Sequence, residues 1–274
     1  MSILTYQANF SAVARAFVEA RRSNAIVPDY PGTLPVGLAD AYATQDVGIR
    51  LVDKSVGGWK VGRVAPHLVD EVGTDRIAGP IFADSIFYAD NLASVNMPVL
   101  TGFAAAEAEL MLRIGATVPL HADILSIRDY IDDVRFGIEI ASSPFPGINE
   151  HGPAVTVSDF GNNFGLVLGP QIDDWRKRDL LAAPVELALD GEVVGRGRLF
   201  DMLDGPFGAA VFLVNLLSSR GIVLTPGTWI STGAITGVHN IVAGQSVRAI
   251  FDNAFEVSCG TRHYSPTLQM SGVK

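Results

Sequence analysis

The chain has 274 residues, 48% of them hydrophobic, so it can bury the core of one large domain or of a large and a small domain. Its formal net charge of -9 excludes nucleic acid as an expected partner, because phosphate binding requires a basic surface. The single cysteine, Cys259, cannot close an intrachain disulfide, and the N-terminus lacks a secretory signal pattern, so we expect a cytoplasmic protein. The most apolar stretch, 208–217, is too short to span a bilayer, which predicts no membrane partner.

Helices are expected in the first part of the chain. Residues 10–22 place apolar side chains at helical spacing, which favours an amphipathic helix. A loop rich in proline and glycine, 28–35, leads to a second expected helix over 38–52. Gln45 falls on the inward stripe of that helix, where an amide satisfied by backbone groups is the better explanation. After about residue 57, short apolar runs broken by Gly, Pro and Asp predict strands and turns.

The later elements follow from turn residues and periodicity. The Asp-Gly pair at 190–191 is a strong signal for a β-hairpin. Residues 206–220 are typical of a helix, with Gly221 as its natural terminator. Segments 228–235 and 245–251 are expected to form closing strands.

Three glutamates stand out from this pattern. Side chains two apart on a strand share a face, so Glu107 and Glu109 point one way, and Glu139 lies on the polar face of the expected strand 134–140. Carboxylates gathered at close range repel one another unless a cation neutralises them, and ligand sets made only of oxygen favour Mg²⁺, Mn²⁺ or Ca²⁺ over Zn²⁺. By spacing alone, two exposed strand faces explain the pattern somewhat better.

A lysine surrounded by glycines is the second candidate. In the segment 57–62, Trp59 and Val61 share one face of an extended strand, and Lys60 lies on the other face with glycines. Glycine lets a ligand approach closely, and an ammonium group can donate a proton or stabilise an enolate oxygen. Taken alone, the lysine is better explained as a surface residue of an edge strand.

Two polar segments are weaker signals. In 230–237, hydroxyl side chains alternate with glycines, a combination able to hold a carboxylate, and 158–163 is a polar loop. Both patterns are common in proteins without a site. The histidines have no zinc-ligand spacing, and neither a Gly-x-Ser-x-Gly elbow nor a phosphate-binding glycine loop is present.

The order of these segments resembles the fumarylacetoacetate hydrolase superfamily, and within it the branch of 2-keto-4-pentenoate hydratases and 4-oxalocrotonate decarboxylases. The match covers nearly the whole chain. The matching segments are 39–45, 58–62, 107–109, 139–140, 166–169, 190–194, 205–206, the helix with Asn215, and 232–237. The resemblance makes a metal site the favoured explanation of the glutamates.

The resemblance implies an α+β protein with a mixed β-roll. It further implies an N-terminal helical part, 1–95, that carries the Lys60 strand, and a β-rich metal-binding catalytic domain, 96–274. A homo-oligomer is expected, and pairing with a related lyase subunit is compatible with it. The residues assigned to Mg²⁺ or Mn²⁺ are Glu107, Glu109 and Glu139, with Lys60 as the catalytic group. The residues assigned to substrate are Thr232, Thr236, Asp159 and Asn162.

The implied function is that of a metal-dependent lyase, a hydratase or a decarboxylase, acting on small 2-oxo and 2-hydroxydienoic acids from aromatic catabolism. One alternative is a carbon-carbon hydrolase of acylpyruvates, which needs a His/Glu pair and has only His67 available here. The other is a non-catalytic subunit that binds a 2-oxo acid. The family's Pro-Asp-Phe-Gly segment corresponds to 76–80, where its candidate acid/base Asp is absent.

Overall fold

The computed structural model describes residues 3–89, 95–119 and 123–266. Its helices are α1 (Ile3–Ser23), α2 (Leu38–Val52), α3 (Val69–Val72), α4 (Pro153–Ser158) and α5 (Gly205–Ser219). The first strands are β1 (Val56–Arg63), β2 (Arg76–Phe82), β3 (Ile86–Tyr88), β4 (Val95–Val99), β5 (Phe103–Ile114), β6 (Ile131–Ser143) and β7 (Asn163–Gln171). The later strands are β8 (Pro184–Leu189), β9 (Glu192–Arg198), β10 (Trp229–Ser231), β11 (His239–Asn240), β12 (Ser246–Phe251) and β13 (Phe255–His263).

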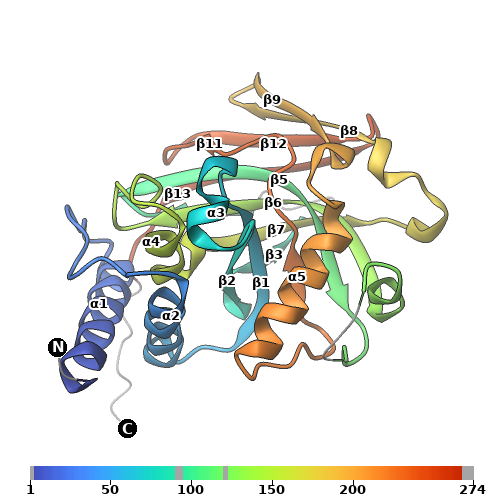
Figure 1. The fold of residues 1–274 in the computed structure, drawn as a ribbon. Coiled ribbons are helices and arrows are strands. Elements are labelled where there is room, and N and C mark those ends of the chain that lie inside the picture. Colours follow the sequence, from blue (N-terminus) through green and yellow to red (C-terminus); the bar gives the residue numbers. More distant parts are fainter. Residues whose placement is uncertain (1–2, 90–94, 120–122, 267–274) are drawn as a thin grey trace, which may run out of the picture.

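Two sheets organise the molecule. An eight-stranded sheet has the order β2-β1-β10-β5-β6-β7-β3, with β11 paired to β5, and a five-stranded sheet has the order β4-β13-β12-β8-β9. Figure 1 shows α1 and α2 at one side of the sheets, α5 against the larger sheet, and the hairpin of β8 and β9 at the opposite end from the termini. The expected α+β class with a mixed sheet is therefore confirmed.

The long antiparallel strands β5 and β6 lie at the centre of the larger sheet. One face of β5 carries Ala108, Leu110 and Leu112, and all three join the main hydrophobic core, as the alternation predicted. The opposite face carries Met111, which packs with Ile81 and other side chains in a smaller apolar cluster. Both faces are buried, so any polar group on the second face lies inside the protein.

The helices and turns agree well with the sequence. Helix α2 spans the predicted range, and α5 is followed by Gly221 in the left-handed region (φ 71°). Helix α1 begins at Ile3, upstream of the predicted start at residue 10. The amide of Gln45 donates to the carbonyls of Ala78 and Val157, both at 3.1 Å, so its predicted backbone role is confirmed.

The strands agree in kind but not in every boundary. The predicted hairpin at Asp190 and Gly191 joins β8 to β9, with both residues at positive φ. The expected strand 228–235 is only Trp229–Ser231, because the chain then turns at Gly233 (φ 113°). The division after residue 95 stays a prediction, and β1 and β2 lie in the same sheet as β5. Among the residues described, no helix is both long and apolar enough to cross a membrane.

Candidate metal centre

The three glutamates meet on one face of β5 and β6. Glu107 lies directly opposite Glu139 in the antiparallel register, and Glu109 lies opposite Gly137. One carboxylate oxygen from each glutamate lies within 4.8 Å of the others. Glu107 is 5% exposed, and Glu109 and Glu139 are fully buried, so the alternative of two exposed strand faces is wrong.

Hydrogen bonds hold two of these carboxylates and leave one oxygen of each free. Oε2 of Glu109 accepts bonds from the Ser231 hydroxyl and, at 2.9 Å, from the Gly233 amide. Oε1 of Glu139 accepts a bond of 2.8 Å from Nδ2 of Asn163. In the described part of the chain, the other oxygens, Glu109 Oε1 and Glu139 Oε2, are buried without a partner. A buried acceptor without a partner is costly, so this donor set suits a cation.

The charges of the centre indicate the same ligand. Like charges directly opposite on neighbouring strands destabilise a sheet. Burial, opposed by Lys60 and reinforced by Glu139, raises the pKa of Glu107 to about 7. Burial and the two neighbouring carboxylates also raise the pKa of Glu109 well above its ordinary value. Three ionised carboxylates and the Lys60 ammonium sum to a charge of -2 (-3 + 1), which a divalent cation would neutralise.

Lys60 reaches the centre from β1, which lies inside the sheet between β2 and β10. Its ammonium nitrogen is 3.5 Å from Oε1 of Glu139, and the side chain is 6% exposed, so the alternative of a surface lysine is wrong. Burial lowers the pKa of Lys60, but the three carboxylates outweigh that effect and hold it above its ordinary value. A Cβ at Gly62 would lie 3.7 Å from Nζ, so this glycine leaves space beside the ammonium.

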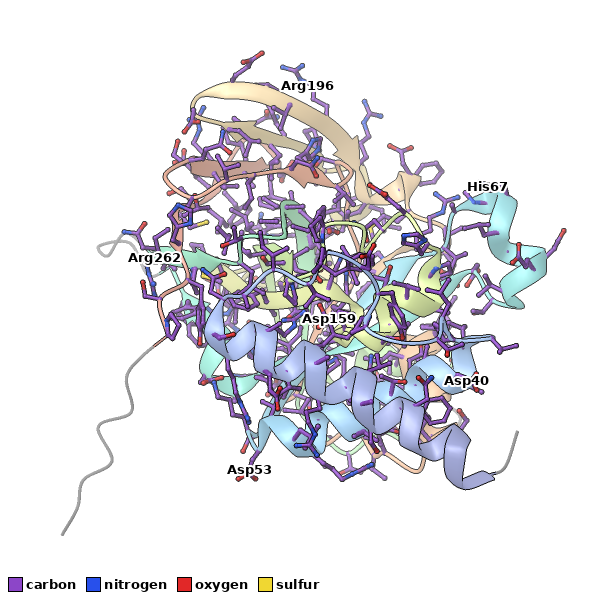
Figure 2. All side chains as sticks on the ribbon, turned by 90° about the vertical axis from the view of Figure 1, so that its left-hand side faces the viewer. Asp40, Asp53, His67, Asp159, Arg196 and Arg262 are labelled. Atoms are coloured by element: carbon purple, nitrogen blue, oxygen red, sulfur yellow. The ribbon has the colours of Figure 1, made fainter. Side chains whose placement is uncertain are left out.

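A buried ion pair between Arg21 and Asp159 lies next to the segment that contacts Glu139. Nε and Nη2 of Arg21, at the end of α1, bind the carboxylate of Asp159, and Nη1 donates to the carbonyl of Asn163 at 2.9 Å. The hydroxyl of Ser143 donates to Oδ2 of Asp159 at 2.6 Å. Figure 2 shows Asp159 next to α1. Asp159 is fully buried in these contacts, and the arrangement holds the segment that presents Asn163 to Glu139.

The other predicted substrate residues have different surroundings. The hydroxyl of Thr232 donates to the carbonyl of Leu110 at 2.8 Å, and that of Thr236 is buried without a partner among the described residues. The amide of Asn162 lies between Lys60 and Asn149. Of the four, Asn162 is the one that contacts the centre directly through a hydrogen bond, and the substrate assignment stays a prediction.

Sequence reasoning missed several residues that orient the centre. Ser231 and Asn163 lie in the two polar segments noted above, but nothing in those segments indicated that they bind Glu109 and Glu139. The sequence analysis gave Arg21 no role, although its guanidinium binds Asp159. Its role depends on a contact with a residue 138 positions away, which leaves no local signal.

Comparisons with known proteins agree with this geometry. No family model matches the chain. The 2-keto-4-pentenoate hydratase of Burkholderia vietnamiensis (strain G4 / LMG 22486) is 29% identical over 255 residues, which cover 89% of this chain and 94% of the relative. A structure of 4-oxalocrotonate decarboxylase from Pseudomonas putida G7, complexed with calcium and acetate, superimposes with a TM-score of 0.75 at 22% identity, covering 93% and 97% of the two chains.

A second solved structure has a similar fold at lower sequence identity. Fumarylpyruvate hydrolase from Pseudomonas aeruginosa, in complex with Mn²⁺ and pyruvate, has a TM-score of 0.56 at 18% identity and covers 75% of this chain and 89% of its own. The fold of this chain is therefore the fold of these two structures, and the names of the curated relatives agree with the resemblance. The relatives of this chain are on the branch of the hydratases and decarboxylases.

Proposed function

We propose that the protein is a metal-dependent lyase, a hydratase or a decarboxylase, acting on small 2-oxo and 2-hydroxydienoic acids. The observation that carries the proposal is the buried triad Glu107, Glu109 and Glu139 with Lys60 beside it. The hydratase relative spans nearly the whole chain, which supports a hydro-lyase as the first choice.

The metal proposed is Mg²⁺ or Mn²⁺, held by the three glutamates. Carboxylate oxygens are the ligands that these hard cations prefer. When bound, the cation supplies Lewis acidity that stabilises negative charge on the oxygens of a 2-oxo acid. The network of Asn163 and Ser231 orients the carboxylates before any ligand arrives.

Lys60 is the proposed catalytic group. Without a bound cation, the three carboxylates outweigh burial and hold the pKa of Lys60 above its ordinary value, so Nζ carries a proton at neutral pH that it can donate or use as a fixed positive charge. The burial of the centre excludes water, which strengthens the attraction between the ammonium and an enolate oxygen.

The hydrolase alternative finds less support in the structure. His67 lies on the exposed short helix Pro66–Leu68, at the edge of the molecule in Figure 2, and no contact with the three glutamates is found among the described residues. Homo-oligomerisation, pairing with a related subunit and a cytoplasmic location remain predictions from the sequence.

The test is to incubate the purified protein with 2-hydroxypenta-2,4-dienoate, 4-oxalocrotonate or acetylpyruvate, with Mg²⁺, Mn²⁺ or EDTA, and to follow the ultraviolet spectrum. We expect loss of the dienoate or enone band that depends on the metal. The E109Q variant should lose metal binding, and K60M should keep metal binding but lose turnover. Survival of all three compounds with the metal-loaded wild type would refute the lyase and favour a binding subunit.

A matched control distinguishes the loss of a charge at the three glutamates from the loss of a charge elsewhere on the protein. Glu19 is an exposed glutamate on α1, so E19Q removes the same charge without touching the triad. Manganese affinity equal in E109Q and E19Q would contradict the ligand assignment.

A further inference from the structure

A side-chain amide is the neutral partner of Lys60. Oδ1 of Asn162 lies 3.3 Å from Nζ of Lys60, and Nδ2 of Asn162 donates to Oδ1 of Asn149 at 3.1 Å. Both ends of the amide are therefore engaged. The bond to Asn149 directs the amide oxygen toward the ammonium.

The backbone that presents this amide is in an uncommon conformation. Three consecutive residues, Phe160, Gly161 and Asn162, have φ of 57°, 62° and 55° in the left-handed region. Asparagine and glycine tolerate this region, but phenylalanine rarely adopts it. Such conformations persist only where the surrounding structure holds them, and they gather at functional sites.

Close packing holds the segment in place. A side chain at Gly79 would overlap the carbonyl of Phe160, so this glycine permits the approach of the segment to β2. The Phe160 ring packs edge-on against Phe82 at 5.4 Å and lies under the Arg21 guanidinium at 5.1 Å. The segment that carries Asn162 is thereby fixed against the strand next to Lys60.

Strand β2, which pairs with the strand of Lys60, supplies no carboxylate to the ammonium. Residues 76–80 carry no acidic side chain. A Cβ placed at Gly62 would meet a carbon of Ile77 at 3.5 Å and Nζ of Lys60 at 3.7 Å. Asn162 and the glutamates therefore determine where the ammonium points.

We propose that Asn162 is a positioning residue that holds the Lys60 ammonium for the reaction proposed above, on which this inference rests. In this role it acts through Lys60. Removing its amide lets the lysine side chain move and slows the chemical step. Binding of the metal by the glutamates remains, because the amide of Asn162 bonds to Lys60 and Asn149 and not to a carboxylate.

The variant N162G tests this, because glycine tolerates the left-handed backbone and removes the side chain with its amide. The control is N253G, since Asn253 has φ of 52° in an exposed turn between β12 and β13. With Mn²⁺ and 2-hydroxypenta-2,4-dienoate, we expect kcat of N162G to fall about tenfold or more, with KM and Mn²⁺ affinity within about twofold of wild type. N253G should match the wild type.

A second measurement does not depend on turnover. In metal-free protein labelled with ¹⁵N-lysine, the Lys60 ammonium signal, assigned with K60M, should shift or broaden in N162G but not in N253G. An unchanged Lys60 signal, or a raised KM with unchanged kcat, would overturn the positioning role. If the wild type turns over none of the probes, the proposed function fails while the spectrum still decides this inference. If N162G does not fold, N149A is measured in the same way, because it removes the exposed acceptor that directs the amide of Asn162 toward Lys60.

Discussion

Replacing Glu107 with glutamine should stabilise the metal-free protein while weakening its metal site. Glu107 is buried opposite Glu139, and none of the hydrogen bonds found in the described part of the chain involves its carboxylate. The E107Q side chain keeps nearly the same volume and removes a carboxylate whose charge is opposed by burial and by Glu139. The usual effect of a buried substitution is a loss of stability, so a gain would be diagnostic.

The magnitude follows from the pKa. The pKa of Glu107 rises from an ordinary value of 4.5 to about 7 on folding. A raised carboxyl pKa means that the folded state favours the protonated form, so its contribution to stability is lost as pH rises from 4.5 through about 7. At pH 8 the ionised group costs folding about 3 kcal/mol, because each tenfold change in an ionisation constant corresponds to about 1.4 kcal/mol. We expect E107Q to recover much of this cost, a rise in Tm of roughly 6 to 10 °C.

The assay is thermal unfolding by circular dichroism after treatment with a chelator, at pH 5 and pH 8, with E19Q as the exposed control. The advantage of E107Q over the wild type should be large at pH 8 and small at pH 5. Calorimetry should show Mn²⁺ affinity reduced about tenfold or more, because a ligand charge is lost. If metal-free E107Q unfolds below the wild type at pH 8, the ionised Glu107 carboxylate is not costly to bury beside Glu139, and the electrostatic argument for a cation is refuted.

Three further outcomes are expected. N163A should weaken Mn²⁺ binding roughly tenfold to a hundredfold in calorimetry, because Glu139 loses the amide that orients it; unchanged affinity would contradict that role. R21Q should lower the free energy of unfolding in urea by about 3 kcal/mol, since Asp159 stays buried without its cation, whereas the exposed R15Q should change it little. Mn²⁺ at a hundred times its Kd should stabilise the wild type by about 2.7 kcal/mol, and no shift in Tm would exclude binding to the folded state.

Local patterns predicted much of the secondary structure because they depend on neighbours in the chain. The helical spacing over 38–52 and the Asp-Gly turn of the hairpin both appear where the residues indicated. The end of β10 was missed because Ile235 is apolar but lies beyond the turn at Gly233. A strand ends where its backbone partners end, and that depends on distant segments.

The sequence singled out the three glutamates that the structure brings together, but it did not indicate the residues that hold them in place. Alternation placed Glu107 and Glu109 on one face, and that face is a property of the strand itself. Alternation did not show that this face is buried, because burial depends on the distant segments that pack against the strand. The same limit applies to Asn162, which resembled a polar loop residue and proved to contact Lys60 from 102 positions away.

By itself, the sequence determined which side chains share a strand face, which turns close the hairpins, and which oxygen-rich residues are available to a hard cation. Only the tertiary structure decided that Glu139 lies opposite Glu107, that Lys60 arrives from another strand, and that α1 supports the centre through Arg21. The physical reason is the range of the interactions. Side-chain periodicity extends over a few residues, whereas charge repulsion and burial act between segments that are neighbours only in the folded chain.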